Sequence, residues 1–479
     1  MADTKFAGVL TGRARSATLA RRIREGHKLA AKKKTAKKAG ARKTAKKAVK
    51  KVPAKKAAAK KALAAPVRRA GKRVAGKADK PVGKSGLSAS RLRRLQEAMD
   101  GYVARGEVAG VVTLVHRHGE TAHVGVAGWQ DKEARVPMKR DSLFRIASMT
   151  KPVVSVATMM LVEEGLLRLS DPIGRWLPEL ADMKVLPRPD APLSEARPAE
   201  RPISVRDLLT HRSGLSYVLT AEGPLAGALA EFNELVYPKI IGTDEWLARL
   251  GQLPLSYPPG QRWHYGLSTD VLGLLLGRVT GTSFAEVLDG RIFQPLGMKD
   301  TGFWVPEKKW KRFGPAYTPH PETGQRIVVD PARGSRWQDP RSFPSGGAGL
   351  VSTIDDYLKF GRMMLGGGAA DGVRLLSRKS VELMTANVLS EQERNTPFLG
   401  LPFWAGRGFG LGFGVVHDIA QYDAYASAGQ FGWPGAYGTF WAADPAEDMV
   451  MLMMIQLYFG RDCKIGLDFQ TLVYQSIVD

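Results

Sequence analysis

The sequence predicts an α/β (α+β) fold in which one sheet is assembled from both ends of a folded body and helices fill the middle. Three observations support this prediction. Apolar residues at helical spacing, followed by strand-like segments, open the folded part, and helical patterns dominate between about Val153 and Gly281. After about Gly346 the chain becomes rich in strand-like segments again. Helices placed between two groups of strands favour a single sheet with a helical insertion.

A basic segment precedes this body, and we expect residues 1–86 to form a disordered tail and residues 87–479 the folded domain. Residues 1–90 hold 29 of the 71 Lys and Arg residues but three of the 46 acidic ones, a net charge of +26, whereas the remainder carries −1. Between about Ala30 and Lys84 the composition is mostly Lys and Ala, so this stretch cannot bury enough apolar surface to offset the entropy of ordering. Its composition resembles the tails of linker histones and of bacterial Lys/Ala-rich nucleoid proteins. It is either a solubilising linker or an arm that binds nucleic acid or another polyanion non-specifically.

Cysteine and apolar content restrict the class of protein. Cys463 is the single cysteine among 479 residues, which excludes an intrachain disulfide and a cysteine-based metal cluster. The N-terminal residues lack the apolar core of a secretion signal, and the longest apolar stretches, such as 449–455, are far below a membrane-spanning length. We therefore expect a cytoplasmic protein without a membrane span.

The secondary structure of the body follows from the spacing of apolar residues. The first predicted helix is capped by Ser88 or Ser90, and its apolar residues recur at helical intervals. Two strands are expected around the turn at His118, Gly119 and Glu120. The apolar residues of the first helix are Leu92, Leu95, Met99 and Val103; the later elements are two helices, 244–253 and 270–279, four strands, 410–416, 424–431, 437–442 and 449–456, and a last helix, 465–477.

The segment from Phe144 to Gly165 contains a serine and a lysine at the spacing of a reactive pair. Ser148 is the one serine in the sequence with a lysine three residues later, and residues i and i+3 on a helix lie about 5–6 Å apart. Lys151 can therefore reach the Ser148 hydroxyl. Pro152 is tolerated only in the first turn of a helix, which places Ser148 at the helix N-terminus, where the dipole favours negative charge. A hydroxyl beside a cation and a positive helix end is typical of an activated serine nucleophile.

Five ordered segments of this sequence resemble the penicillin-recognising serine hydrolases, which include class C β-lactamases, D-alanyl-D-alanine carboxypeptidases and related carboxylesterases. The similarity covers about 390 residues, essentially everything after the tail. It implies a class C β-lactamase-like fold, an antiparallel sheet flanked by helices plus a helical lobe. The sheet lobe is expected from about 87–147 and 340–479, and the helical lobe from about 148–339. The segments are FRIASMTKPVVSVATMMLVEEG, ISVRDLLTHRSGLSY, YPPGQRWHYGLSTDVLGLLLGRVTG, SGGAGLVSTIDDYLKF and FGWPGAYGTFWAADP.

The resemblance assigns a second catalytic position to Tyr265, in the segment HYGLS. A free phenol has a pKa near 10, so it needs a neighbouring cation such as Lys151 to act as the base for acylation and then as the acid for the leaving group. The β-lactamases usually carry Asn two residues later, where this sequence has Leu267. Because leucine cannot hydrogen-bond to a β-lactam side-chain amide, the substitution favours the esterase branch.

The third motif, Lys-Thr-Gly in the lactamases, falls on Trp433-Pro434-Gly435. The lysine is replaced by an aromatic ring, which offers apolar area to an ester rather than a charge to a carboxylate. This resembles the Trp-Gly-Gly version found in the family's esterases, except that Pro434 replaces the first glycine. The resemblance further implies that the backbone N–H groups of Ser148 and Ala436 hold the oxyanion. The expected substrate-binding residues are Trp433, Gly435, Leu267 and Tyr217, and a packing role stays open for Trp433 and Tyr217.

Histidines are not expected to act in this chemistry. His264 lies beside Tyr265, but the lysine and the tyrosine already fill the role of the base. His211 lies in the structural segment of the resemblance and is expected to be a hydrogen-bonded scaffold residue. Three further histidines lack a carboxylate or cysteine at ligand spacing, so neither a metal site nor a cofactor is expected. These three are His116, His118 and His123.

The sequence therefore predicts a serine hydrolase that acts on a small-molecule carboxylic ester through an acyl-enzyme on Ser148, with Lys151 and Tyr265 as acid and base. Amide cleavage and acyl transfer are compatible with the same residues. A D-Ala-D-Ala peptidase or β-lactamase is one alternative, against which Leu267 and Trp433 argue. A nucleoid-associated binding protein with the hydrolase body as scaffold is another. The sequence gives no indication of the oligomeric state.

Overall fold

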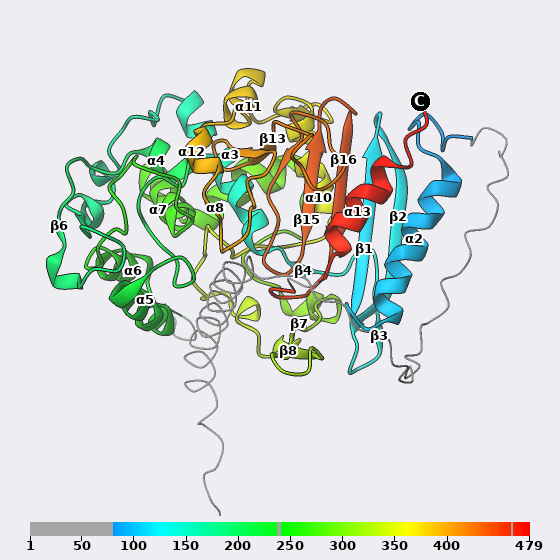
Figure 1. Ribbon diagram of the computed structural model, residues 1–479, viewed down its shortest axis with the longest axis horizontal. Coiled ribbons are helices and arrows are strands. Elements are labelled where there is room, and N and C mark those ends of the chain that lie inside the picture. The colour runs from blue at the N-terminus through cyan, green and yellow to red at the C-terminus, as the bar shows by residue number, and fades with distance from the viewer. Residues whose placement is uncertain (1–79, 237–240, 461–462) are drawn as a thin grey trace, which may run out of the picture. The chain divides into compact units, whose positions relative to one another are not determined.

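The computed structural model describes residues 80–236, 241–460 and 463–479, which belong to one compact unit (Figure 1). The predicted basic tail lies outside the described residues up to position 79. Its last seven residues are described and pack against the body. Pro81 pairs with Ser88, and the fully buried Ser85 accepts a hydrogen bond on its carbonyl from the Arg117 guanidinium at 2.7 Å.

An eight-stranded antiparallel sheet forms the centre of the body, in the order β12-β13-β14-β15-β16-β1-β2-β3. The first three strands of the chain thus pair beside the last five, which confirms the predicted antiparallel sheet assembled from both ends. Its strands are β1 (Gly110–Arg117), β2 (Glu120–Asp131), β3 (Val136–Pro137), β12 (Arg407–Phe409), β13 (Gly414–Val416), β14 (Phe431–Gly432), β15 (Phe440–Asp444) and β16 (Met449–Met454). Four two-stranded ribbons lie outside it: β4 (Phe144–Arg145) with β9 (Val351–Ser352), β5 (Lys184–Val185) with β6 (Arg197–Pro198), β7 (Ala316–Pro319) with β8 (Arg326–Asp330), and β10 (Ala369–Ala370) with β11 (Val373–Arg374).

Helices cover both faces of the sheet, so its central strands are apolar on both sides. Side chains alternate between faces along a strand. On one face of β1, Val111 and Val115 pack with α2 (Ala89–Ala104) and α13 (Ile465–Tyr474), which lie side by side in Figure 1. On the other face, Val112 and Leu114 belong to the core that contains α3 (Thr150–Glu163) and α10 (Ile354–Leu365). A strand buried on both faces reads as a continuous apolar run, and β16, with the sequence MVMLMM, is such a strand.

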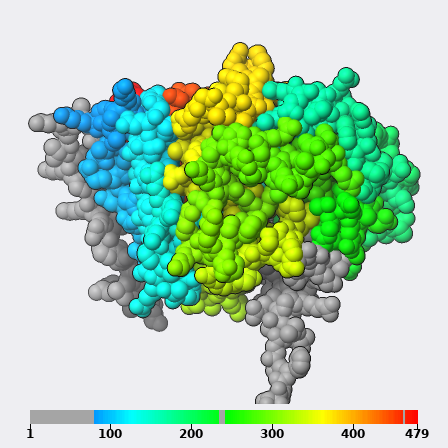
Figure 2. All heavy atoms as spheres, turned by 180° about the vertical axis from the view of Figure 1, so that it is seen from behind, coloured from blue at the N-terminus to red at the C-terminus, as the bar shows by residue number. Residues whose placement is uncertain are grey.

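The middle of the chain forms the helical lobe, which occupies one side of the molecule in Figure 2, opposite the N-terminal elements. Its main helices are α4 (Val205–Leu209), α5 (Gly223–Val236), α6 (Thr243–Leu250), α7 (Ser268–Thr280), α8 (Phe284–Leu288) and α9 (Gln294–Leu296). Across the described residues no single helix is long and apolar enough to cross a membrane, although the pair 268–280 and 284–296, bent by 86°, together reaches that length and composition. The remaining helices are α11 (Arg378–Met384), α12 (Glu391–Arg394), the π-helical η5 (Asp289–Phe293) and the short 3-10 turns η1 (Ala147–Met149), η2 (Ile173–Arg175), η3 (Pro178–Leu180), η4 (Leu193–Glu195), η6 (Glu307–Arg312) and η7 (Arg336–Gln338).

Several local predictions are confirmed. Ser88 caps α2, whose buried residues include the predicted Leu92, Leu95 and Met99. The β1–β2 turn places His118 and Gly119 at positive φ, as a tight two-residue hairpin requires. Pro152 lies in the first turn of α3, as predicted.

Two strand predictions are wrong in extent. The expected strand 410–416 is interrupted, because Gly412 has φ of 91° and approaches α3 so closely that a Cβ there would lie 2.0 Å from the Ser155 hydroxyl oxygen. The expected strand 424–431 reduces to its end at β14, since residues 424–428 form an irregular connection and Gly429 and Gln430 only exchange single backbone hydrogen bonds with Val416. A tight turn at glycine and an apolar loop both resemble strands in sequence, and only the packing of distant segments separates them.

Candidate active site

Ser148 lies in a strained turn between the sheet lobe and α3. It is the middle residue of η1, which follows β4 and runs directly into α3. The preceding Ala147 has φ of 43°, a left-handed conformation that costs an L-residue about 1–2 kcal/mol. The Tyr357 hydroxyl on α10 steadies the turn by donating to the Met149 carbonyl at 2.7 Å. Because Ser148 is partly exposed while both neighbours are buried, the turn presents the serine hydroxyl to the outside.

Lys151 is the buried partner of that hydroxyl. Its side chain is 1% exposed, and its Nζ donates to Ser148 Oγ at 3.2 Å and to the Gly347 carbonyl at 2.7 Å. The nitrogen also lies 4.6 Å from the ring centre of Tyr265 and 5.3 Å from that of Tyr217. A carbonyl and two aromatic faces therefore replace the water that a lysine nitrogen normally binds.

Asp270 holds the carbonyl that receives Lys151. This carboxylate is 2% exposed; its Oδ1 accepts from Ser345 Oγ at 2.5 Å and from the Gly347 N–H at 3.0 Å, and its Oδ2 accepts from the Tyr217 hydroxyl at 3.2 Å. A Cβ at Gly347 would lie 2.4 Å from the Tyr217 oxygen, so the close approach requires glycine. The sequence analysis missed Asp270. The available signal was an acidic residue on the buried α7, since buried carboxylates in proteins are paired or hydrogen-bonded.

Tyr265 completes a short hydrogen-bond chain around the serine. Its hydroxyl donates to Ser148 Oγ at 2.8 Å, and the Trp433 indole N–H donates to the Tyr265 oxygen at 3.1 Å. Tyr265 and Trp433 are 9% and 4% exposed. The sequence analysis attributed only apolar area to Trp433, whereas its N–H also supplies a neutral donor to the tyrosine.

The segment after Trp433 lies against the residues that precede Ser148. A Cβ at Gly435 would lie 2.3 Å from the Ile146 carbonyl oxygen, and Thr439 Oγ1 donates to the same oxygen at 3.2 Å. This close backbone approach requires glycine at position 435, and its predicted role in substrate binding stays a prediction. Ala436 follows Gly435 directly, and its carbonyl accepts a hydrogen bond from the Phe459 backbone N–H at 3.0 Å.

The other predicted residues lie around this centre in different roles. Leu267 caps α7 with 7% of its surface exposed and belongs to the apolar core. His264 is hydrogen-bonded through Nε2 to Ser216 Oγ at 2.8 Å. His211 packs on the Tyr265 ring at 4.8 Å, and burial, reinforced by Lys151 and then His264, holds the pKa of His211 well below its usual range. In the described ranges no group of three His, Cys, Asp or Glu side chains is placed to hold a metal ion.

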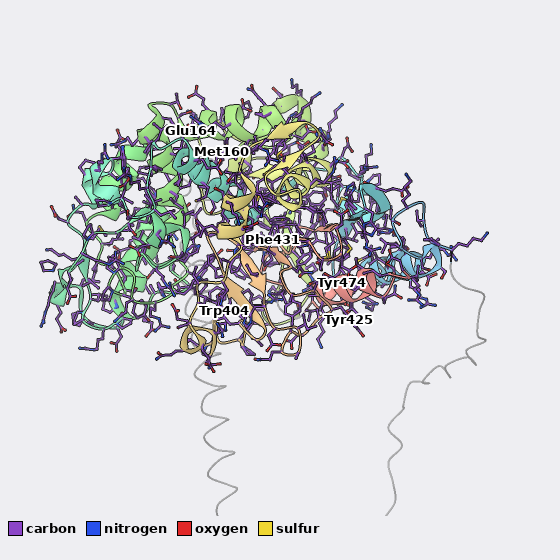
Figure 3. The ribbon with its side chains drawn as sticks, turned by 90° about the horizontal axis from the view of Figure 1, so that it is seen from above. Met160, Glu164, Trp404, Tyr425, Phe431 and Tyr474 are labelled. Atoms are coloured by element: carbon purple, nitrogen blue, oxygen red, sulfur yellow. The ribbon has the colours of Figure 1, made fainter. Side chains whose placement is uncertain are left out.

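Aromatic rings surround Tyr265 and Trp433. Trp263, Trp404 and Phe409 are buried with them in one cluster, and three partly exposed rings pack against it: Tyr217, Phe398 and Phe403. Figure 3 shows Trp404 toward the helical lobe, away from Tyr474 on α13. The sequence analysis did not identify the segment 398–404. A separate cavity of about 240 Å³ lies elsewhere, lined by residues such as Phe293, Thr301 and Trp304, and contains none of the site residues.

The chain is similar to proteins whose descriptions agree with this geometry. A model of the family described as Beta-lactamase matches residues 95–466. Protein Rv1367c of Mycobacterium tuberculosis (strain ATCC 25618 / H37Rv) is 44% identical over 354 residues, 73% of this chain and 86% of that protein. Esterase EstB of Burkholderia gladioli is 33% identical over 406 residues, 81% of this chain and 96% of its own length. Among solved structures, EstCE1, described as a hydrolase with promiscuous acyltransferase activity, matches with a TM-score of 0.67 and 28% identity over 81% of this chain and 98% of that one.

The partly buried His264 predicts a loss of stability in mild acid. Burial, reinforced by Arg262, lowers the pKa of His264 from 6.5 to about 4. Between pH 6.5 and 4 the unfolded chain therefore binds a proton at this histidine that the native protein does not, so the contribution of His264 to the free energy of unfolding falls by about 3 kcal/mol as pH falls through this window. His123 and His211, whose pKa values burial also lowers, add to the same slope. His264→Asn, which keeps a polar partner for Ser216 and does not titrate, should flatten that slope. Urea unfolding of both proteins at pH 7, 6 and 5 measures it, and equal slopes would contradict the assignment.

Proposed function

The chain belongs to the β-lactamase family of serine hydrolases, and on that premise we propose that it cleaves carboxylic esters through an acyl-enzyme formed on Ser148. The family match confirms the predicted resemblance to the penicillin-recognising hydrolases. The observation that carries the proposal is that Lys151 and Tyr265 both lie within hydrogen-bonding distance of the same serine oxygen, at 3.2 and 2.8 Å. A nucleophile with two partners that can move its proton is the arrangement that acyl transfer needs.

In acylation, Ser148 Oγ attacks the ester carbonyl carbon while its proton passes to the Tyr265 oxygen. The two oxygens are 2.8 Å apart, with the Tyr265 hydroxyl as donor. The tyrosine proton is therefore first released to solvent, and the hydrogen bond then reverses, so that Ser148 becomes the donor and its proton passes to the tyrosine oxygen. The Lys151 cation and the Trp433 N–H stabilise the negative charge that the tyrosine oxygen carries before it accepts this proton. The N–H groups of Ser148 and Ala436 stabilise the tetrahedral oxyanion. As the carbon–oxygen bond breaks, Tyr265 returns the proton to the leaving alcohol.

The acyl-enzyme is resolved by the reverse sequence. Water, or a second alcohol, attacks the acyl carbon and gives its proton to the Tyr265 oxygen, and that proton then returns to Ser148 Oγ as the carboxylic acid or the new ester departs. The description of EstCE1 as a hydrolase with acyltransferase activity supports both resolutions on this fold. No cofactor takes part in these steps.

Two substitutions support an ester rather than a β-lactam or D-Ala-D-Ala substrate. Trp433 replaces the lysine that the lactamases carry in the third motif, so the side chain at this position offers an aromatic ring and a neutral N–H but no charge. Leu267 replaces an asparagine and lies in the apolar core. The similarity to an enzyme described as Esterase EstB supports the same substrate class.

Replacement of the three reacting side chains tests the mechanism. Ser148→Ala should abolish both fluorophosphonate labelling and p-nitrophenyl butyrate turnover, because no other hydroxyl replaces the nucleophile. Lys151→Ala and Tyr265→Phe should each lower kcat by about 10²–10⁴, the usual contribution of a positioned acid–base group. The matched control is Ser194→Ala, at an exposed position remote from the site, which should label and turn over as the parent does. Full turnover by the Ser148 variant would refute the proposal.

Substrate preference is a second test. Short-chain p-nitrophenyl esters should be hydrolysed with a kcat/KM far above that for nitrocefin or benzylpenicillin, since Trp433 supplies no charge for the β-lactam carboxylate. Both substrate sets are measured with the same enzyme preparation. Comparable kcat/KM values for nitrocefin and the esters would replace the esterase assignment with a lactamase one.

We further propose that residues 1–86 bind polyanions such as nucleic acid without reading their sequence. The support is the charge distribution, in which residues 1–90 carry a net +26 and the remainder −1. Lysine runs neutralise phosphates but offer no placed readers of base edges.

A truncation separates the tail from the hydrolase. Removing residues 1–79, so that the packed residues 80–86 stay in place, should abolish DNA binding and leave ester turnover unchanged. Binding by the full chain should weaken steeply with salt, with a log–log slope of about −0.9 per phosphate neutralised. A salt-titrated DNA-binding assay beside the ester assay measures both. Undiminished binding by the truncated protein would show that the charge distribution does not explain the affinity.

A further inference from the structure

A tight hairpin places two aromatic rings beside the catalytic tyrosine. Phe398 and Leu401 exchange two backbone hydrogen bonds, of 2.9 and 3.0 Å, around the turn residues Leu399 and Gly400, which have φ of 51° and 77°. Two consecutive residues at positive φ are typical of the tight hairpin turn that matches strand twist. The hairpin is therefore a defined structure, with Leu401 exposed next to the turn and Phe398 and Phe403 packed against the aromatic cluster.

The rings of this hairpin contact the residues that carry the chemistry. The ring centre of Phe398 lies 5.4 Å from that of Tyr265, and that of Phe403 lies 5.7 Å from that of Trp433. The two phenylalanine rings are 5.3 Å apart. Tyr265 and Trp433 are buried, whereas Phe398 and Phe403 are partly exposed, so the phenylalanines provide accessible apolar surface on this side of the reacting hydroxyl.

The hairpin is tied to the catalytic segment by charge. Glu393, in α12, accepts a hydrogen bond from the Arg212 guanidinium at 2.6 Å. It also accepts one at 2.9 Å from the backbone N–H of Trp263, which lies two residues before Tyr265. Arg407 stacks over the Phe403 ring at 5.0 Å and is itself held by the Tyr422 hydroxyl at 2.7 Å. Such contacts fix the ring positions relative to Tyr265, which a surface loop without them would not achieve.

We propose that Phe398 and Phe403 are specificity-determining residues that bind the apolar acyl or alcohol substituent of the ester held at Ser148. The inference rests on the ester hydrolase function proposed above and defines its substrate class: neutral esters with an apolar group larger than acetyl or methyl. An ester carbonyl at Ser148 Oγ lies beside the Tyr265 hydroxyl, and a substituent extending from it toward Trp433 reaches the exposed phenylalanine faces. Burial of added methylene groups against those faces raises kcat/KM, because each methylene group in a well-fitted apolar site raises kcat/KM about tenfold or more.

The experiment compares Phe398→Ala and Phe403→Ala with a matched control, Leu401→Ala, on the same hairpin but with an exposed side chain. Each variant is assayed with p-nitrophenyl acetate, butyrate and hexanoate, which lengthen the acyl part, and with methyl, butyl and benzyl acetate, which enlarge the alcohol part. The phenylalanine variants should lose about tenfold or more in kcat/KM for the larger members of one series and less than threefold for the smallest. Leu401→Ala should keep the parental ratio between large and small substrates.

The series in which the selective loss occurs identifies the substituent that the rings bind. An equal loss on small and large esters, or no loss in either series, would overturn the proposal. If an alanine variant does not fold, Phe398→Leu and Phe403→Leu, which keep most of the apolar volume, should show the same selectivity change at smaller size. Fluorophosphonate labelling of Ser148 separates the two proposals. If the phenylalanine variants are still labelled and keep the parental selectivity, only the role of the hairpin is rejected. If labelling of the parental enzyme does not depend on Ser148, the hydrolase mechanism is rejected.

Discussion

The burial of Lys151 is the constraint on which the rest of the site depends. A lysine side chain removed from water is costly unless other groups replace the solvent. Here the Gly347 carbonyl and the ring faces of Tyr217 and Tyr265 replace the solvent around the Lys151 nitrogen. The Asp270 carboxylate accepts a hydrogen bond from the backbone N–H of the same glycine. These groups come from separate segments of the chain, so α3, α7 and the glycine turn must meet at one point before the lysine can be buried. The contacts that make its burial tolerable also direct its nitrogen at the serine.

The turn that carries Ser148 is held by the same convergence. Ala147 adopts a left-handed conformation that the local sequence does not favour, and such strain persists only where surrounding structure fixes it. The turn is fixed on two sides, by Tyr357 on α10 and by the close backbone approach of Gly435, which lies in the connection between β14 and β15. Bulk at either contact would move Ser148 relative to Lys151 and Tyr265. The antiparallel sheet built from both ends of the chain therefore acts as the frame that keeps three distant segments in register.

The features of this site that could be predicted from the residues alone are those formed within a short segment of the chain. The spacing of Ser148 and Lys151 depends on a single helix turn, and the apolar periods of α2 and β1 are readable without any partner. The resemblance to a known family added Tyr265 and Trp433, which lie more than 100 residues from the serine along the chain. Asp270 was missed because its role is to hold a peptide group 77 residues away, which no local pattern encodes. The hairpin 398–404 was missed because phenylalanines in a loop become part of a site only through contact with distant rings.

The replacement of a motif lysine by Trp433 changes the electrostatics of the site as well as its shape. An indole N–H donates one hydrogen bond and adds no charge, and here that bond goes to the Tyr265 oxygen. In the proposed acylation, negative charge on the tyrosine oxygen is balanced by Lys151 and one neutral donor. The side chains that continue from Trp433 toward the surface are the rings of Phe403 and Phe398. A carboxylate placed against Trp433 would lose water without gaining a cation from it, whereas an apolar ester substituent loses nothing by the same contact. One substitution therefore completes the hydrogen-bond chain of the mechanism and, by removing a charge, favours neutral substrates.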